Sequence, residues 1–167
     1  FRDFARKSSE EIVSEVSLKA VAERILKLLS ESARRAKVSL HLKGIDELPT
    51  IYSNEKDLEQ LFFALVENAI QAADGKKSRQ FIIDGAVKDE QIKLRFADNC
   101  GGIAPENLDK IFEPFFTTRP AGEGTGLGLC VVEHIVSRAG GKVRVASKAG
   151  EGSTFFVTLP ISRGRMS

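Results

Sequence analysis

The chain has 167 residues, 42% of them hydrophobic, and its 25 basic and 23 acidic residues give a formal net charge of +2. This length suits one well-packed domain and is too short for two ordinary ones. The interspersed charges lack the concentrated positive excess of a nucleic-acid-binding or membrane-surface protein, and no apolar run approaches the ~20 residues of a membrane span.

Two cysteines, Cys100 and Cys130, are present without paired metal-ligand spacing. They are expected to be reduced thiols, which indicates a cytoplasmic domain. No signal peptide is recognised, and the chain begins with Phe1 rather than Met. We therefore expect a piece of a longer protein, and a parent anchored in the inner membrane is compatible with this sequence.

Secondary structure is predicted from the spacing of apolar residues, which is three to four positions in a helix and two in a strand. In chain order the sequence predicts a helix at 17–37, strands at 38–44 and 50–52, a helix at 54–74, strands at 80–87 and 91–97, a short helix near 105–110, a helix at 126–139, and strands at 142–147 and 153–159. Asn54 is expected to cap the second helix and Gly75 to end it.

Helices and hairpins alternate in blocks instead of forming strict βαβ units. This order indicates the α+β class, and specifically a two-layer α/β sandwich. We expect a mixed, mostly antiparallel sheet that helices cover on one face.

The helix predicted at 54–74 carries a polar residue at the edge of its apolar face. At 100° per residue, one stripe contains Leu58, Leu61, Phe62, Leu65, Ala69 and Ala72. Asn68 falls at the edge of this stripe, although Asn is a poor helix former, and a half-buried amide needs a partner. Two interpretations are open: a hydrogen bond to a neighbouring loop, and contact with a ligand or metal.

The segment FADNCGGIAPE, residues 96–106, places an acid at the end of a predicted strand. Asp98 could accept a hydrogen bond from an exocyclic amine such as that of adenine. Gly101 and Gly102 would allow a flat ring to approach the backbone because they carry no Cβ. A simple Asp-Asn turn is the alternative.

A glycine-rich segment, GEGTGLGL at residues 122–129, leads directly into the next predicted helix. Backbone N–H groups at a helix N-terminus form an anion site that suits phosphates. The spacing matches neither the dinucleotide fingerprint nor the Walker A pattern. The stretch 117–125 is polar and rich in glycine, which predicts a mobile lid, and Phe112, Phe115 and Phe116 are expected to anchor its base.

Together these motifs resemble the ATP-binding catalytic domain of two-component sensor histidine kinases. LEQLFFALVENAIQAA resembles the family's N box, DNCGGI its G1 box, IFEPFF its F box, GTGLGL its G2 box and GEGSTF its last glycine-threonine motif. The resemblance implies the Bergerat fold over residues 17–160, with a mobile ATP lid. It also implies that residues 1–16 are the end of a dimerisation and phosphoacceptor hairpin with its linker, and residues 161–167 are expected to be a disordered tail.

The resemblance implies roles for individual residues. Asn68 would hold Mg²⁺, and Asp98 would bind the adenine amine of ATP. Arg119 is a candidate for contacting the γ-phosphate, with a solvated lid charge as the alternative, and catalysis is assigned to Asn68 and Arg119. Other residues expected to contact ATP are Ala72, Gly102, Ile103, Phe115, Thr117, Thr118, Gly124, Thr125, Gly126, Leu127, Gly128, Leu129 and Thr154, the last near adenine behind Asp98.

Two positions depart from the family's pattern. Ala64 stands four positions before Asn68, where family members usually carry a second polar residue and related ATPases place a water-activating Glu. Its apolar side chain argues against efficient ATP hydrolysis. Cys100 stands where the first glycine of the G1 box is usual, so its backbone has less freedom.

A histidine kinase needs an acceptor histidine, which the family carries on a separate helical hairpin. This chain has only His41 and His134, and both are expected to be exposed bystanders. The resemblance therefore implies a domain that passes the γ-phosphoryl group of Mg–ATP to a histidine elsewhere in the parent. Relay to a response regulator receiver domain would follow, with the fragment monomeric and the parent homodimeric.

Three alternatives stay open. An anti-sigma-factor-type serine kinase is disfavoured by the linker-like N-terminal sequence. A gyrase- or MutL-type ATPase is disfavoured by Ala64 and by the short lid. An ATP-independent docking module is disfavoured because Asn68, Asp98, Gly126 and Gly128 are all present.

Overall fold

The computed structural model describes residues 12–116 and 128–161. Its elements are β1 (Ser14–Val16), α2 (Leu18–Leu28), α3 (Ser30–Arg35), β2 (Val38–Lys43), β3 (Ile51–Ser53), α4 (Glu55–Ala72), β4 (Arg79–Lys88), β5 (Gln91–Asp98), a 3-10 turn (Pro105–Asn107), α5 (Gly128–Arg138), β6 (Lys142–Lys148) and β7 (Gly152–Pro160). The predicted tail is described only at its first residue.

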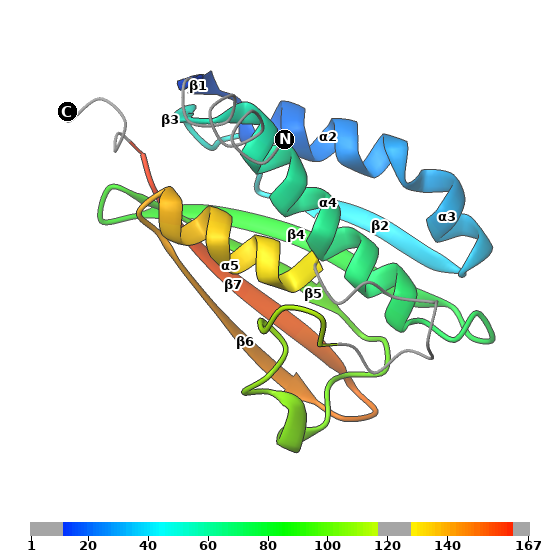
Figure 1. Ribbon diagram of the computed structural model, residues 1–167. Helices are drawn as coiled ribbons and strands as arrows, with labels where there is room; N and C mark the ends of the chain where they lie inside the picture. The colour runs from blue at the N-terminus through cyan, green and yellow to red at the C-terminus, as the bar shows by residue number, and fades with distance from the viewer. Residues whose placement is uncertain (1–11, 117–127, 162–167) are drawn as a thin grey trace, which may run out of the picture.

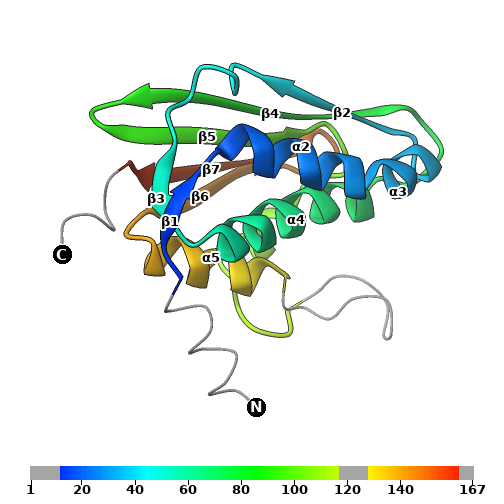
Figure 2. The ribbon, with the colours of Figure 1, turned by 90° about the horizontal axis from the view of Figure 1, so that it is seen from above.

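One layer of the domain is a five-stranded sheet in the order β2-β4-β5-β7-β6 (Figure 1). β2 runs parallel to β4, and the other three neighbouring pairs are antiparallel. The second layer consists of α2, α4 and α5, which lie on one face of the sheet (Figure 2). The predicted sandwich, with a mixed and mostly antiparallel sheet, is therefore confirmed.

The core lies between these two layers. α4 packs against α2 on one side and α5 on the other. Phe62 of α4 and Phe96 of β5 are both buried, and their ring centroids lie 5.1 Å apart in an edge-on arrangement. Aromatic pairs of this geometry stabilise a core beyond the area that they bury. The helix that carries Asn68 is thus fixed to the strand that ends at Asp98.

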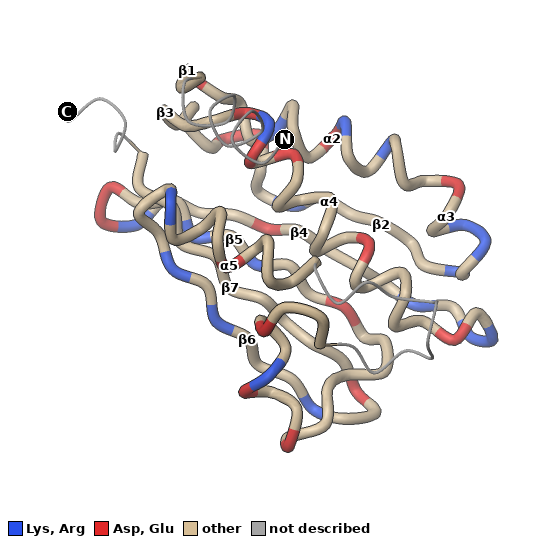
Figure 3. Tube along the Cα trace, viewed as in Figure 1, with Lys and Arg blue, Asp and Glu red and all other residues tan. Residues whose placement is uncertain are grey.

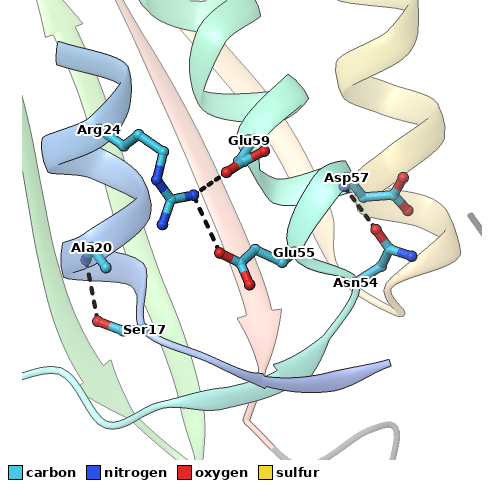
Figure 4. Close-up of polar contacts among 7 residues, drawn as sticks. All are labelled: Ser17, Ala20, Arg24, Asn54, Glu55, Asp57 and Glu59. Atoms are coloured by element: carbon cyan, nitrogen blue, oxygen red, sulfur yellow. Dashed lines mark hydrogen bonds and ion pairs between the residues drawn. The ribbon is translucent and has the colours of Figure 1, made fainter. Parts of the chain in front are cut away.

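The first predicted helix is two helices in the structure. Ser17 caps α2, because its hydroxyl accepts a hydrogen bond from the Ala20 N–H at 3.1 Å (Figure 4). The helix ends at Leu28, and the next residue, Leu29, redirects the chain into α3 with a φ of −96° and a ψ of 4°. Leu29 and Ala33 are both buried. Apolar spacing alone could not locate this change of direction, because both helices bury residues at helical spacing.

Asn54 caps α4 as predicted. Its side-chain oxygen accepts a hydrogen bond from the Asp57 N–H at 2.9 Å (Figure 4). Its amide nitrogen donates to the Ile12 carbonyl at 2.8 Å. At the same end, Arg24 of α2 forms ion pairs with Glu55 and Glu59 of α4. These contacts join the start of α4 to α2 and to the first described residues.

A short strand was not predicted. β1 pairs antiparallel with β3, and Val16 is buried in the core. Both β1 and the Ile12 contact fall within residues 1–16, which were expected to be hairpin end and linker. The described part of that segment is therefore packed against the domain. A strand of three residues gives too little alternation to be recognised from sequence.

α4 ends two residues before the predicted position. Its last residue, Ala72, is exposed, whereas the rest of the predicted stripe is buried. Val66 and Ile70, which the stripe left out, are buried as well. The buried face is broad because α4 contacts α2, α5 and the sheet. Beyond the helix, Gly75 has a φ of +75°.

The sheet face that points away from the helices is strongly basic. Its charged side chains are Lys43, Lys88, Lys93, Arg95, Lys142, Arg144 and Lys148, with Asp84 as the acid among them. Arg95 is paired with Asp84 at 3.0 Å, and the Arg144 guanidinium lies 3.9 Å from the ring centroid of Phe156. Figure 3 shows the basic residues along β6. The nearly neutral net charge of the chain hides this local excess.

Candidate functional site

Asn68 lies in the last part of α4, between buried Leu65 and Ala69 on one side and solvent on the other. Its side chain is half-buried, as predicted. Ala72 follows one turn later on the same side of the helix. A Cβ built on Gly101 would lie 3.6 Å from the Ala72 carbonyl oxygen, so the end of α4 borders the loop that follows β5. Asn68 thus lies one helical turn from this loop.

Asp98 is the last residue of β5. Its Oδ1 accepts a hydrogen bond from the Cys100 N–H at 2.9 Å, and its carboxylate also accepts one from the Ser153 backbone. Burial raises the pKa of the Asp98 carboxyl, and these hydrogen bonds oppose that rise because they favour the ionised form. A carboxylate that is fixed and partly desolvated in this way can accept a hydrogen bond from a ligand amine.

The residue after Asp98 is fastened to the neighbouring strand. Asn99 accepts a hydrogen bond from the Gln80 N–H at 2.8 Å through its side chain, and Arg79 donates to the Asn99 carbonyl at 3.1 Å. The turn therefore continues the pairing of β4 and β5 beyond the strand ends. The side chain of Asn99 therefore extends the strand pairing and does not form a local turn, whereas the local side-chain bond is the one from the Cys100 N–H to Asp98.

Cys100 fits its position without a glycine. It is 1% exposed, and its φ is not in the left-handed region, so glycine-like freedom is not required there. Burial, reinforced by the nearby Asp98 charge, raises the pKa of the Cys100 thiol to about 12. The thiol is therefore neutral and fills the space below the loop. The departure from the family's pattern leaves the backbone unstrained.

Gly102 is needed for a different contact from the one predicted. Its φ is +73°, and a Cβ there would lie 2.2 Å from the Lys148 carbonyl oxygen. The absence of a side chain lets the loop after β5 lie directly on the β6–β7 turn. Gly150 reinforces this contact by donating its N–H to the Gly101 carbonyl at 2.7 Å. The expectation that Gly102 makes room for a flat ring is corrected, since the neighbouring turn occupies that space.

The structure also corrects the prediction for Thr154. In β7 the buried side chains alternate from Ser153 onward, and Ser153 lies opposite Asp98 in the pairing with β5. Thr154 lies opposite Ala97, so its side chain points to the face away from the helices. Ser153 is the hydroxyl residue beside Asp98, and it was missed. The two-residue period of β7, counted from Asp98, was the signal that could have identified it.

The segment after the 3-10 turn brings aromatic residues to the same region. The rings of Phe112 and Phe155 are 6.2 Å apart and edge-on, and Phe116 packs against the core. Phe115 is 74% exposed with a φ of +68°, which is uncommon for a residue with a bulky side chain. Phe112 and Phe116 thus anchor the segment as predicted, whereas Phe115 points into solvent. Ile103 is partly buried against the core.

The predicted phosphate-binding segment is described only at its end. Arg119, Thr117, Thr118, Gly124, Thr125, Gly126 and Leu127 lie outside the described residues. Gly128 begins the described part of α5, is exposed, and has open space where a Cβ would be. Leu129 is partly buried against the core. The first described residue of α5 thus has no side chain of its own beside its backbone N–H group, which suits an anion site at a helix N-terminus.

Both histidines lie away from these residues. His41 is exposed, and its Nε2 lies 2.7 Å from Gln80 Oε1 on the basic sheet face. His134 is exposed on α5, opposite buried Val132 and Val136, with its Nε2 3.4 Å from a guanidinium nitrogen of Arg138. The prediction that both are exposed is confirmed.

In the described part of the chain, no group of three or more His, Cys, Asp or Glu side chains could hold a metal ion. Asn68 is a single oxygen donor. Mg²⁺ typically keeps several waters and is bound through one or two protein oxygens together with substrate phosphates, so one amide oxygen fits this ion. Across the described ranges, no helix is long and apolar enough to span a membrane.

These residues offer polar groups of two kinds. Asp98 offers an acceptor at the end of β5, Asn68 an amide oxygen near the end of α4, and α5 its N-terminal N–H groups. A hydrogen-bond acceptor for a base at one side and donors for an anion at the other match the chemistry of a nucleoside triphosphate.

Comparisons with known proteins show the family of this chain. Residues 53–163 match the family described as histidine kinase-, DNA gyrase B-, and HSP90-like ATPase. The chain is 37% identical over 147 residues to the sensor histidine kinase ZraS of Escherichia coli strain K12, which covers 88% of this chain and 31% of that protein. It is 35% identical over 164 residues to the two-component sensor PprA of Pseudomonas aeruginosa, covering 95% of this chain and 18% of that protein.

Solved structures show the same architecture. The catalytic domain of histidine kinase ThkA has a TM-score of 0.77 at 23% identity, with 90% of this chain and 97% of that chain covered. Full-length ShkA in complex with AMPPNP has a TM-score of 0.78 at 26% identity, with 89% of this chain and 31% of that chain covered. The chain spans about a third of the length of ZraS. On the family match over residues 53–163, this chain is a member of the histidine kinase-, DNA gyrase B- and HSP90-like ATPase family.

Proposed function

We propose that this chain is the ATP-binding catalytic domain of a sensor histidine kinase. It transfers the γ-phosphoryl group of Mg–ATP to a histidine on a separate helical domain of the parent protein. From there the group passes to an aspartate of a response regulator receiver domain. The proposal is supported by the resemblance to ZraS and PprA, whose names describe sensor proteins of this kind.

The observation that carries the proposal is the geometry around Asp98. Two backbone N–H groups, of Cys100 and Ser153, orient the carboxylate at the end of β5. Gly102 holds the following loop against the β6–β7 turn. Asp98 then accepts a hydrogen bond from the exocyclic amine of adenine. A base that carries a carbonyl in place of this amine would place one acceptor against another, so the site selects adenine.

The phosphate end of the site is assigned to Asn68, the start of α5 and the lid. Asn68 would hold Mg²⁺ through its amide oxygen, and the ion, when bound, supplies charge neutralisation for phosphoryl transfer. The N–H groups from Gly124 to Leu129 would bind the phosphates, and Arg119 would contact the γ-phosphate. Positioning and electrostatic stabilisation account for most of the catalysis of such transfers, so few side chains are needed.

The chain has features that favour transfer over hydrolysis. Ala64, one turn before Asn68, is half-buried and cannot activate a water molecule. Neither His41 nor His134 lies beside the nucleotide site, so the acceptor belongs to another domain. Residues 1–16 would connect to that domain, and the parent would be a homodimer with its catalytic domains in the cytoplasm.

Calorimetry with Mg–ATP tests the site assignment. The wild-type chain should bind, and Asn68→Ala and Asp98→Ala should each weaken binding at least tenfold, because each removes a direct polar contact. Matched controls are Gln60→Ala, an exposed amide on the same helix, and Asp46→Ala, a carboxylate paired with Lys19 at 3.3 Å far along the chain from the site. Unchanged affinity in both site variants would refute the assignment.

The acceptor assignment has its own test. The chain is mixed with radiolabelled ATP, with and without the histidine-bearing hairpin of the parent protein. Label should accumulate on the hairpin and not on the isolated chain. Accumulation on His41 or His134 would contradict the proposal, and the absence of heat with millimolar Mg–ATP would favour a docking module.

A further inference from the structure

The hydroxyl of Ser147 occupies a junction that the proposed nucleotide contacts do not account for. Ser147 lies near the end of β6 and pairs with Ser153 of β7. Its Oγ lies 2.7 Å from the Ile103 N, 3.0 Å from the Gly152 carbonyl oxygen and 2.8 Å from the Ser153 Oγ. One side chain thus contacts the loop after β5 and two successive residues of β7.

One assignment of donors and acceptors satisfies all three contacts at this junction. A serine hydroxyl has one proton and two lone pairs. Ser147 donates its proton to the Gly152 carbonyl and accepts from the Ile103 N–H, which leaves one lone pair for the Ser153 hydroxyl proton. In this arrangement the proton and both lone pairs of the Ser147 hydroxyl have partners, and the Ser153 hydroxyl donates its proton to Ser147.

The junction lies next to Asp98, the residue proposed to bind adenine. The Ser153 backbone donates to the Asp98 carboxylate, and the two residues are opposite each other in the β5–β7 pairing. Side chains of such cross-strand pairs are neighbours. If Ser147 did not hold the Ser153 hydroxyl, its proton could turn to the Asp98 carboxylate, which is its partner on the facing strand. An adenine amine would then compete with an internal donor.

We propose that Ser147 is a positioning residue for adenine recognition. It fixes the loop after β5 through Ile103 and keeps the Ser153 proton away from Asp98. The carboxylate, which already accepts from the Cys100 N–H and thiol and from the Ser153 N–H, thus keeps its remaining acceptor position for the amine of the base. This inference rests on the proposed function, since it assumes that Asp98 binds adenine. It adds a residue that touches neither the nucleotide nor Asp98.

The test compares ATP with inosine triphosphate, which carries a carbonyl where adenine has its amine. Calorimetry gives the affinity of both nucleotides for the wild-type chain, Ser147→Ala and Ser147→Thr. We expect Ser147→Ala to lower the preference for ATP over inosine triphosphate about fivefold, as the loss of one hydrogen bond allows. Ser147→Thr retains the hydroxyl and should restore most of the preference.

Thr154→Ala is the matched control, because it removes a hydroxyl from the same hairpin on the opposite face of the sheet. It should keep the wild-type preference. A purely structural role of Ser147 would lower the thermal midpoint and weaken both nucleotides equally, and an unchanged ratio in Ser147→Ala would overturn the inference. If the wild-type chain binds neither nucleotide, the proposed function fails instead.

Discussion

The two antiparallel hairpins of the sheet end in turns of very different construction. The β4–β5 turn is exposed, and Asp89 and Glu90 adopt φ values of 55° and 62° although neither is a glycine. The β6–β7 turn uses Gly150 and Gly152 at φ values of 82° and 138°. A Cβ on Gly152 would lie 2.1 Å from the Asp98 carbonyl oxygen. The first turn is free of neighbours that forbid a side chain, and the second is in direct contact with the candidate site.

This difference separates two uses of the left-handed conformation. At Asp89 and Glu90 the conformation only reverses the chain, so ordinary residues are tolerated at a modest energetic cost. Around Gly152 and Gly102 it brings two backbone segments closer than any side chain permits. Changes where the β6–β7 turn contacts the end of β5 and its following loop should therefore have larger consequences than changes in the β4–β5 turn. The following predictions test that expectation.

The largest effect is expected for Gly102→Ala. The added methyl group would overlap the Lys148 carbonyl oxygen, and an alanine would have to adopt the left-handed φ of this position. We therefore expect a loss of about 3 kcal/mol in the free energy of unfolding. ATP binding should be lost with the displaced loop. Urea denaturation and calorimetry measure both quantities. Gly101→Ala is the control, because its methyl group would make an ordinary 3.6 Å contact; equal losses in the two variants would contradict the close-approach argument.

An intermediate effect on ATP affinity and stability is expected from a change of pH, because Asp98, which lies beside the β6–β7 turn, is partly desolvated. Burial raises the pKa of its carboxyl above the ordinary value, so the ionised form that accepts the adenine amine is lost at a higher pH than for an exposed Asp. ATP affinity should fall as the pH falls through this raised pKa. The free energy of unfolding changes in the opposite direction. The protonated carboxyl favours folding at low pH, and this contribution to stability is lost as the pH rises through the raised pKa.

Calorimetry and urea denaturation between about pH 4 and pH 8 would follow both trends. In Asp98→Asn, the pH dependence that Asp98 contributes to ATP affinity and to the free energy of unfolding should disappear. Asp46→Asn should leave both curves as in the wild-type chain. Affinity that stays constant down to the ordinary range of an aspartate would show that desolvation at Asp98 is unimportant for binding.

The smallest effect is expected at the exposed hairpin. Glu90→Gly removes the cost of a left-handed side-chain-bearing residue, which is larger than the extra chain entropy lost by glycine, so the domain should gain roughly 0.5 kcal/mol. ATP affinity should be unchanged. Glu47→Gly, at an exposed loop position without a positive φ, should be slightly destabilising, and a similar result for Glu90→Gly would mean that its turn is unstrained.

Much of this fold could be predicted from the sequence because its elements carry strong local signals. The alternation from Val38 to Leu42, the cap at Asn54 and the glycines after α5 each act within a few residues of the chain. The break at Leu29 and the strand β1 could not be predicted in the same way. Both depend on packing against segments that are distant in sequence, and Val16 is buried only because β3 lies beside it.

The candidate site also has features that local sequence predicts and features that depend on distant packing. Asp98 and Asn68 are predicted site residues because of their positions at a strand end and at the edge of a helix face, and the structure confirms those two positions. The role of Gly102, the place of Ser153 and the junction at Ser147 depend on how β6 and β7 lie against the loop after β5. That relation is set by strand register, which motif spacing does not contain.

The basic outer face of the sheet has a practical consequence for handling the domain. The helices α2, α4 and α5 lie on the other face of the sheet (Figure 2), and the alternation of buried and exposed residues along the strands places these Lys and Arg residues on the outer face. A negatively charged chromatography resin or sensor chip would therefore attract the molecule by this face at low ionic strength, with the helices turned toward the solution. Captured in this way, the domain would present the start of α5 and the end of α4 to any nucleotide that flows past.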